Sequence, residues 1–220
     1  MDLLLQPEEV RVLGSLLEKE VTTPEYYPLS LNTLVNACNQ KSNRDPVVEF
    51  DADTVEQAAQ LLRDKGLLVT ITGAGSRVPK YGHRISEKLN LGRRELAIMC
   101  ELMVRGPQTL GELRTHCERM HKFDDLAEVE AVIERLPELV VRLSRRPGEK
   151  EVRYAHLLSG TPVIPEASEE APPAREGRPD PVAAGRGPDR IAALESEVAR
   201  LRDEIENLKQ QFAGFKRQFE

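Results

Sequence analysis

The sequence predicts an α+β, mainly helical protein with two tandem winged helix-turn-helix domains, then a disordered linker and a C-terminal coiled-coil helix. A pattern of three amphipathic helices and a β-hairpin occurs twice in the first 160 residues. A Pro-rich stretch and then an unbroken heptad pattern follow. We therefore expect four segments: residues 1–90, 91–159, 160–189 and 190–220.

The first helix of each copy is expected over Pro7 to Glu20 and over Arg93 to Arg105, where apolar residues recur at helical spacing. Pro7 suits a first turn, where its missing N–H costs nothing. The second helices share the pattern Ser/Thr-Leu-x-x-Leu-x-x-x-Cys, over Ser30 to Cys38 and Thr109 to Cys117. Both begin with a hydroxyl residue that can cap free N–H groups, and Thr109 with Glu112 has the spacing of a capping box.

The third helices are expected over Asp53 to Lys65, with Gly66 as a left-handed stop, and over Glu128 to Leu136. Each leads into β-branched residues and a turn. We call residues 67–85 the first hairpin and residues 139–156 the second hairpin. Three helices and a hairpin, given twice, is typical of a tandem winged helix. The alternative is two unrelated small α+β domains.

Two stretches carry a resemblance to a known family: Thr22 to Asn32 (TTPEYYPLSLN) and Val35 to Pro46 (VNACNQKSNRDP). They closely resemble the signature of the YceH-like family of bacterial proteins. The resemblance covers about residues 5–160 and implies tandem winged-helix domains, whereas the family's biochemical role is unassigned. The Pro-rich stretch and the heptads lie outside it, so we expect whatever they add to be particular to this chain.

Composition restricts the function classes. The net charge is −6 and none of the segments 1–90, 91–160 and 161–220 has an excess of basic residues, which argues against a strong nonspecific grip on nucleic acid. The three cysteines form no CxxC pair, and there is neither an apolar run long enough to span a membrane nor a secretory signal. We expect a cytoplasmic protein without membrane contact.

DNA contact would have to come from local patches. One patch is the connector between the second and third helices of the first copy, and the others are the two hairpins. The patch of the first hairpin also includes His83. The predicted contact residues are Lys41, Ser42, Asn43 and Arg44 in the connector, Arg77, Lys80 and Arg84 in the first hairpin, and Arg142, Arg145, Arg146, Lys150 and Arg153 in the second. A solvated loop and ordinary hairpin edges are the alternatives.

The third helices are poor DNA readers. Their exposed faces are acidic, most strongly around Asp124, Asp125 and Glu128. The connectors after the second helices are also longer than those of a regular helix-turn-helix.

No chemistry-bearing motif is present, so we expect no enzyme and no cofactor. Walker, GxGxxG, HExxH and GxSxG patterns are absent. His116, Cys117 and His121 do not have helical metal-ligand spacing, and Cys117 is the repeat-mate of Cys38, so no metal is expected.

The final segment predicts a parallel homodimer. Apolar residues occupy its heptad a and d positions. In two parallel, in-register copies, the charged residues beside these positions on one helix face residues of opposite charge on the other. The seam consists of Ile191, Leu194, Val198, Leu201, Ile205, Leu208, Phe212, Phe215 and Phe219. The alternatives are a lone amphipathic helix folded back on the rest of the chain and, for the three phenylalanines, a partner's docking site.

Two functions remain open at this level. We expect a dimeric DNA-binding regulator, which the fold favours by analogy. A protein-interaction scaffold is favoured by the net acidity and by the carboxylate-rich third helices.

Overall fold

The computed structural model describes residues 3–72, 78–145 and 151–161. The protein is α+β: about half of the described residues are helical, and two small antiparallel sheets accompany them. The fold class is confirmed at this level. Apart from Gly160 and Thr161, the predicted linker lies outside the described residues, and so does the whole predicted coiled coil.

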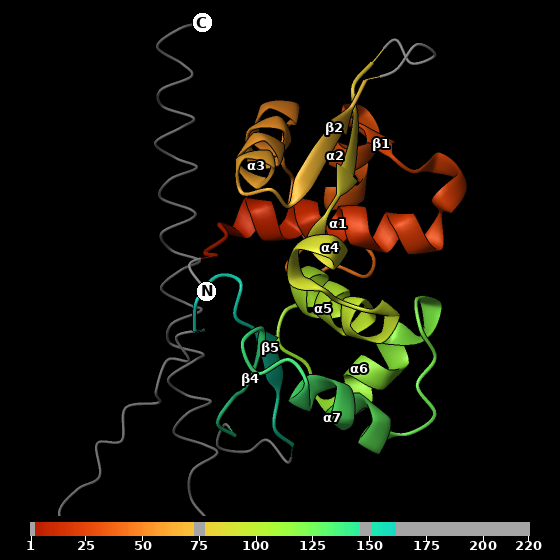
Figure 1. The fold of residues 1–220 in the computed structure, drawn as a ribbon, viewed down its shortest axis with the longest axis vertical. Helices are drawn as coiled ribbons and strands as arrows, with labels where there is room; N and C mark the ends of the chain where they lie inside the picture. The colour runs from red at the N-terminus through yellow and green to blue at the C-terminus, as the bar shows by residue number, and fades with distance from the viewer. Residues whose placement is uncertain (1–2, 73–77, 146–150, 162–220) are drawn as a thin grey trace, which may run out of the picture. The chain divides into compact units, whose positions relative to one another are not determined.

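Both halves contain the predicted order of three helices and an antiparallel strand pair (Figure 1). The elements of the first half are α1 (Pro7–Thr22), η1 (Pro24–Tyr26), β1 (Leu29–Ser30), α2 (Leu31–Cys38), α3 (Ala52–Asp64), β2 (Leu68–Ile71), β3 (Lys80–His83) and α4 (Ile85–Leu89). Those of the second half are α5 (Arg93–Arg105), α6 (Leu110–His116), η2 (Cys117–Arg119), α7 (Leu126–Glu134), β4 (Val140–Arg142) and β5 (Tyr154–His156).

The helix ends follow from local chemistry. Ser30 Oγ accepts a hydrogen bond from Thr33 N at 3.4 Å and begins α2. Before α6, Thr109 Oγ1 accepts from Glu112 N at 3.2 Å, while the Glu112 carboxylate accepts from Thr109 N at 2.8 Å. This confirms the predicted capping box. Gly66 has φ +70, the left-handed conformation predicted for the stop after α3.

Two local expectations were wrong, and one strand was not predicted. Ile85 is the first residue of α4 rather than the end of a strand. The last helix begins and ends about two residues early, at Leu126 and Glu134. It begins early because Asp125 caps it by accepting from Glu128 N at 2.8 Å. The strand β1 was missed, because two residues carry no recognisable period.

β1 completes a three-stranded sheet in the order β1-β3-β2. Leu29 pairs with Tyr81, one residue before the cap of α2. The second half repeats this with a single bridge between Gln108 and Tyr154, one residue before the cap of α6. In both halves the residue before the cap of the second helix is therefore tied to the last strand.

The core is continuous across the two halves. Figure 1 shows α1 with α2, α3 and the β2–β3 pair on one side and α5 on the other, and α1 packs against α5. Both helices are buried on nearly every side, and every residue from Glu9 to Glu18 of α1 is buried. The sequence had suggested a single apolar face on each. The boundary near residue 90 thus separates two sets of elements within one apolar cluster, and the two-domain partition stays a prediction.

The helices within the described ranges include none with the length and apolarity needed to cross a membrane.

Candidate nucleic-acid interface

The predicted connector patch is divided by burial. Lys41 and Ser42 are exposed, whereas Asn43 is half-buried and accepts a hydrogen bond from Arg105 Nη2. Arg44 is buried, and its side chain is 0% exposed. The prediction that Arg44 contacts DNA is therefore wrong, because a fully buried guanidinium cannot reach a phosphate.

Arg44 instead holds the connector to α1 and α2. Its Nη2 donates to Glu18 Oε2 at 2.6 Å and to the Ala37 carbonyl at 2.8 Å, and its Nη1 donates to the Asn43 carbonyl at 2.9 Å. Glu18 is also buried, so each charge supplies the partner that the other needs inside the protein.

The first hairpin keeps one clearly exposed predicted cation among its described residues. Arg84 is 60% exposed and lies 3.6 Å from Glu87, whereas Lys80 is half-buried in β3. His83 is buried: its Nε2 lies 2.9 Å from Glu20 Oε2, and its backbone N–H donates to Tyr27 Oη at 2.7 Å. His83 therefore belongs to the interior, and Arg77 lies outside the described residues.

The second hairpin keeps two exposed predicted cations among its described residues. Arg142 in β4 and Arg145 just after it are exposed. Arg153, one residue before β5, is half-buried. Its Nη1 and Nη2 lie 2.8 and 3.2 Å from the two Glu112 oxygens, and Nη1 also lies 3.0 Å from the Pro107 carbonyl. It ties the hairpin to the start of α6. Arg146 and Lys150 lie outside the described residues.

The third helices present acids, as the sequence predicts. On α3, the side chains of Asp53, Glu56 and Asp64 are exposed, and on α7 those of Glu130 and Glu134. A phosphate approaching either face meets repulsion. The exposed predicted cations of the hairpins lie on the strands or just beyond them.

A second charged feature was missed by sequence reasoning. Glu18 of α1 also accepts from Arg119 Nη2 at 2.7 Å, and Glu101 of α5 lies 2.9 Å from Arg105 Nε. We call Glu18, Arg44, Glu101, Arg105 and Arg119 the buried charge cluster. Its members are up to 101 residues apart, so no spacing rule could find them. The one available hint was a carboxylate among the apolar positions of each first helix.

The two carboxyls of the cluster differ in pKa. Burial alone would raise the pKa of Glu18, but Arg44, with Arg119 and Lys19, outweighs it and holds that pKa below the ordinary value. Burial raises the pKa of Glu101 to about 7 against the opposing charges of Arg105 and Arg119. Both Glu101 oxygens are buried, and Arg105 Nε, 2.9 Å from Oε2, is the cation paired with them.

Other chemistry finds little support among the described residues. No group of three or more His, Cys, Asp or Glu side chains there could hold a metal ion. Cys38, Cys100 and Cys117 are buried, and burial raises the pKa of each thiol, which makes them poor nucleophiles.

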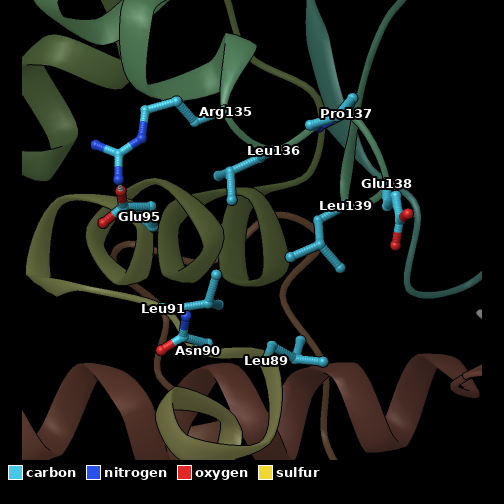
Figure 2. Close-up of a pocket in the computed structure, with 9 residues that line it drawn as sticks. All are labelled: Leu89, Asn90, Leu91, Glu95, Arg135, Leu136, Pro137, Glu138 and Leu139. Carbon is cyan, nitrogen blue, oxygen red and sulfur yellow. Dashed lines mark ion pairs between the residues drawn. The ribbon is translucent and has the colours of Figure 1, made fainter.

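A groove of about 340 Å³ lies between the α4–α5 junction and the α7–β4 turn (Figure 2). An ion pair of 3.1 Å between Arg135 and Glu95 borders it, and Leu136 and Leu139 are already buried. It offers little free apolar surface, and Arg135 is neutralised, so we assign it no ligand.

Comparison with other proteins identifies the relatives of this chain. It is 58% identical over 200 residues to a UPF0502 protein of Solibacter usitatus, covering 90% of this chain and 93% of the relative. UPF0502 proteins of Geotalea daltonii and Geobacter sulfurreducens are each 54% identical over 90% of this chain, and the matches cover 89% and 90% of those proteins.

These matches correct one expectation. A match over 90% of 220 residues must extend well beyond residue 160, so much of the Pro-rich and heptad region is shared with relatives and is not particular to this chain. The family described as "Protein of unknown function, DUF480" matches residues 5–149. The predicted family resemblance is thereby confirmed, and the chain belongs to the DUF480 (UPF0502) family of bacterial proteins.

Proposed function

We propose that this protein is a non-enzymatic, dimeric, tandem winged-helix protein that binds duplex DNA through its hairpins as a transcription regulator does. The observation that carries the proposal is the exposure of Arg142 and Arg145 on the second hairpin, beside a third helix whose open face is acidic. Contact through hairpins rather than through a recognition helix fits this charge distribution.

The topology supports the winged-helix assignment. In each half a residue before the second helix pairs with the last strand, through Leu29–Tyr81 and Gln108–Tyr154. A short first strand added to a hairpin after three helices is what a winged helix requires. The exposed contact set then comprises Lys41, Ser42, Arg84, Arg142 and Arg145.

Dimerisation through residues 190–220 is part of the proposal and depends on the heptads alone. It would double the number of exposed arginines presented to DNA. Introducing charge into the seam, for example Leu201→Lys with Ile205→Lys, should give a monomer by light scattering. An unchanged mass would remove the dimer from the proposal.

The test is binding of the full chain to duplex DNA at stepped salt concentrations. We expect affinity to fall as salt rises. Arg142→Ala with Arg145→Ala should lower both the affinity and the salt slope, the slope by roughly one unit for each phosphate that is no longer neutralised. Arg94→Ala is the matched control, since Arg94 is an exposed arginine of α5 that pairs with Glu128 of α7, outside both hairpins. No binding at low salt, or an equal decrease in the control, would reject DNA binding.

A second candidate is a protein-interaction scaffold, favoured by the acidic exposed faces of α3 and α7. Here a basic partner would bind in place of DNA. Charge reversal of Glu130 and Glu134 should then release a protein that co-purifies from native lysate. Recovery of the homodimer alone would count against this candidate.

A further inference from the structure

An open depression of about 270 Å³ lies where the two halves meet, outside both hairpins. Its lining comes from the connector of the first half, the C-terminal end of α5, and α6 with η2. The lining residues are Asn43, Arg105, Thr115, His116, Glu118 and Arg119. Two of the six carry guanidinium groups, and Glu118 is the acid among them.

The charge behind this depression is not balanced by the buried carboxylates. Arg44 and Arg119 share the carboxylate of Glu18, and Lys19 lies 3.6 Å from the same group. Arg105 faces Glu101, whose burial favours the neutral acid. Cations therefore exceed anions, and Arg105 and Arg119 are the members of the buried charge cluster that reach the depression. Arg105 and Arg119 each have a carboxylate partner, but the shared and partly neutral carboxylates leave a net positive charge, which favours an added anion.

Arg119 still has hydrogen-bonding capacity. Within the described residues, Arg119 uses Nη2 on Glu18, and its Nε and Nη1 have no protein acceptor. Its side chain is 43% exposed, so these donors are accessible from the depression. A guanidinium fork with free donors matches the paired oxygens of a phosphate or sulfate.

His116 has a defined tautomer at this site. Gln108 Nε2 donates to the carbonyls of Glu101 and Gly106, so Gln108 Oε1 must accept at 2.6 Å from His116 Nδ1. Neutral His116 consequently carries its proton on Nδ1 and has a lone pair on Nε2. Burial, and after it Arg105, lowers the His116 pKa, so the ring is neutral at pH 7.

We propose that this depression binds a small oxyanion, a phosphate group either free or carried by a small molecule, between Arg105 and Arg119. Asn43 and Thr115 line the same site, and His116 accepts a hydrogen bond from a protonated phosphate oxygen or takes up a proton when the anion binds. The ligand contacts both halves and thereby stabilises their packing. This proposal does not rest on DNA binding. Arg105, Thr115, His116 and Arg119 are not among the predicted DNA contacts, and Asn43, which is, is half-buried and accepts from Arg105.

The experiment titrates the full chain with inorganic phosphate, replacing chloride at constant ionic strength, and follows the thermal midpoint and calorimetric heat. We expect a saturable rise in Tm, as ligand linkage requires. Arg119→Gln should weaken phosphate affinity about tenfold, in line with the removal of a charged hydrogen bond. Arg94→Gln is the matched control, since Arg94 is 54% exposed and pairs with Glu128 at 3.1 Å, and it should bind phosphate like the parent protein.

Two further measurements keep the test decisive. If Arg119→Gln does not fold, Arg119→Lys keeps the charge beside Glu18 and should still weaken binding, because a single ammonium lacks the fork. Imidazole NMR should show the His116 pKa rising by about one unit in phosphate, since a nearby opposite charge favours the charged ring.

Glycerol 3-phosphate separates the two sources of the phosphate group. Tighter binding than inorganic phosphate identifies a phosphorylated small molecule, and equal binding identifies the free ion. A Tm that responds to phosphate no more than to chloride overturns the proposal, as does an equal decrease of affinity in Arg94→Gln.

Discussion

Gly14 of α1 lies directly against Val104 of α5: a Cβ at Gly14 would stand 2.9 Å from Val104 Cγ1 and 3.0 Å from Met103 Cβ. The Cys100 thiol also lies 3.5 Å from the Gly14 carbonyl. Here the first helices of the two halves approach closely for a specific steric reason. The absence of a side chain at residue 14 allows one core to form from both halves.

Gly14→Ala should therefore destabilise the protein. Overpacking costs about 1–3 kcal/mol, and the gain in helix propensity offsets up to about 1 kcal/mol of this, so we expect a net destabilisation of up to about 2 kcal/mol. Met103 Cβ is fixed to the backbone and cannot rotate away. Urea unfolding measures the change. Gly111→Ala in α6 is the control, because its nearest neighbour would be 3.9 Å away, and its stability should be unchanged or slightly higher.

Arg44→Ala should unfold the protein much more easily than Lys41→Ala. Removing Arg44 leaves the buried Glu18 with weaker compensation, which typically costs about 3–5 kcal/mol. Arg119 and Lys19 still contact Glu18, which places the expected destabilisation at the lower end. Lys41 is exposed, and its replacement should change the free energy of unfolding by less than about 0.5 kcal/mol. Similar values for the two variants would contradict the structural role given to Arg44.

Glu101 should make stability depend on pH in the neutral range. Its pKa is about 7 in the folded protein against an ordinary 4.5, so the folded state binds this proton more tightly than the unfolded state. The resulting stabilisation is fully present below pH 4.5 and is lost as pH rises towards 7. The charged groups that change the pKa of Glu101 are Arg105 and Arg119, which lower it, and Glu18, which raises it.

Comparing the parent protein with Glu101→Gln isolates this effect from the other titrating groups. The free energy of unfolding of the variant, relative to the parent, should rise between pH 5 and pH 8 by roughly 1–3 kcal/mol, since one pKa unit corresponds to about 1.4 kcal/mol. Denaturant titrations at several pH values provide the measurement. A difference that stays constant with pH would show that Glu101 is charged throughout.

His156 should remain neutral well into the acidic range. Burial lowers its pKa to about 4, and its Nδ1 is buried without a hydrogen-bond partner among the described residues. Because the folded pKa lies below the ordinary 6.5, the stabilisation is present above pH 6.5 and is lost as pH falls towards 4. Imidazole NMR over this range tests the point. A His156 midpoint near 6.5 would contradict the burial argument.

The sequence by itself determined the features that depend on a few neighbouring residues. Ser30 and Thr109 cap their helices, and Gly66 takes the left-handed conformation, because these choices depend on local backbone geometry and hydrogen bonding. The acidic faces of α3 and α7 were also predictable, since helical period decides which side chains share a face.

Tertiary structure alone decided which charges reach the solvent. Arg44 and Arg84 belong to similar basic clusters in the sequence, yet Arg44 is buried against Glu18 while Arg84 is exposed. Arg119 and Glu18 meet across 101 residues, and Gln108 pairs with Tyr154 only after the chain has folded back. A charged side chain becomes interior or exposed according to the elements packed over it, and that packing depends on contacts between residues far apart in the sequence.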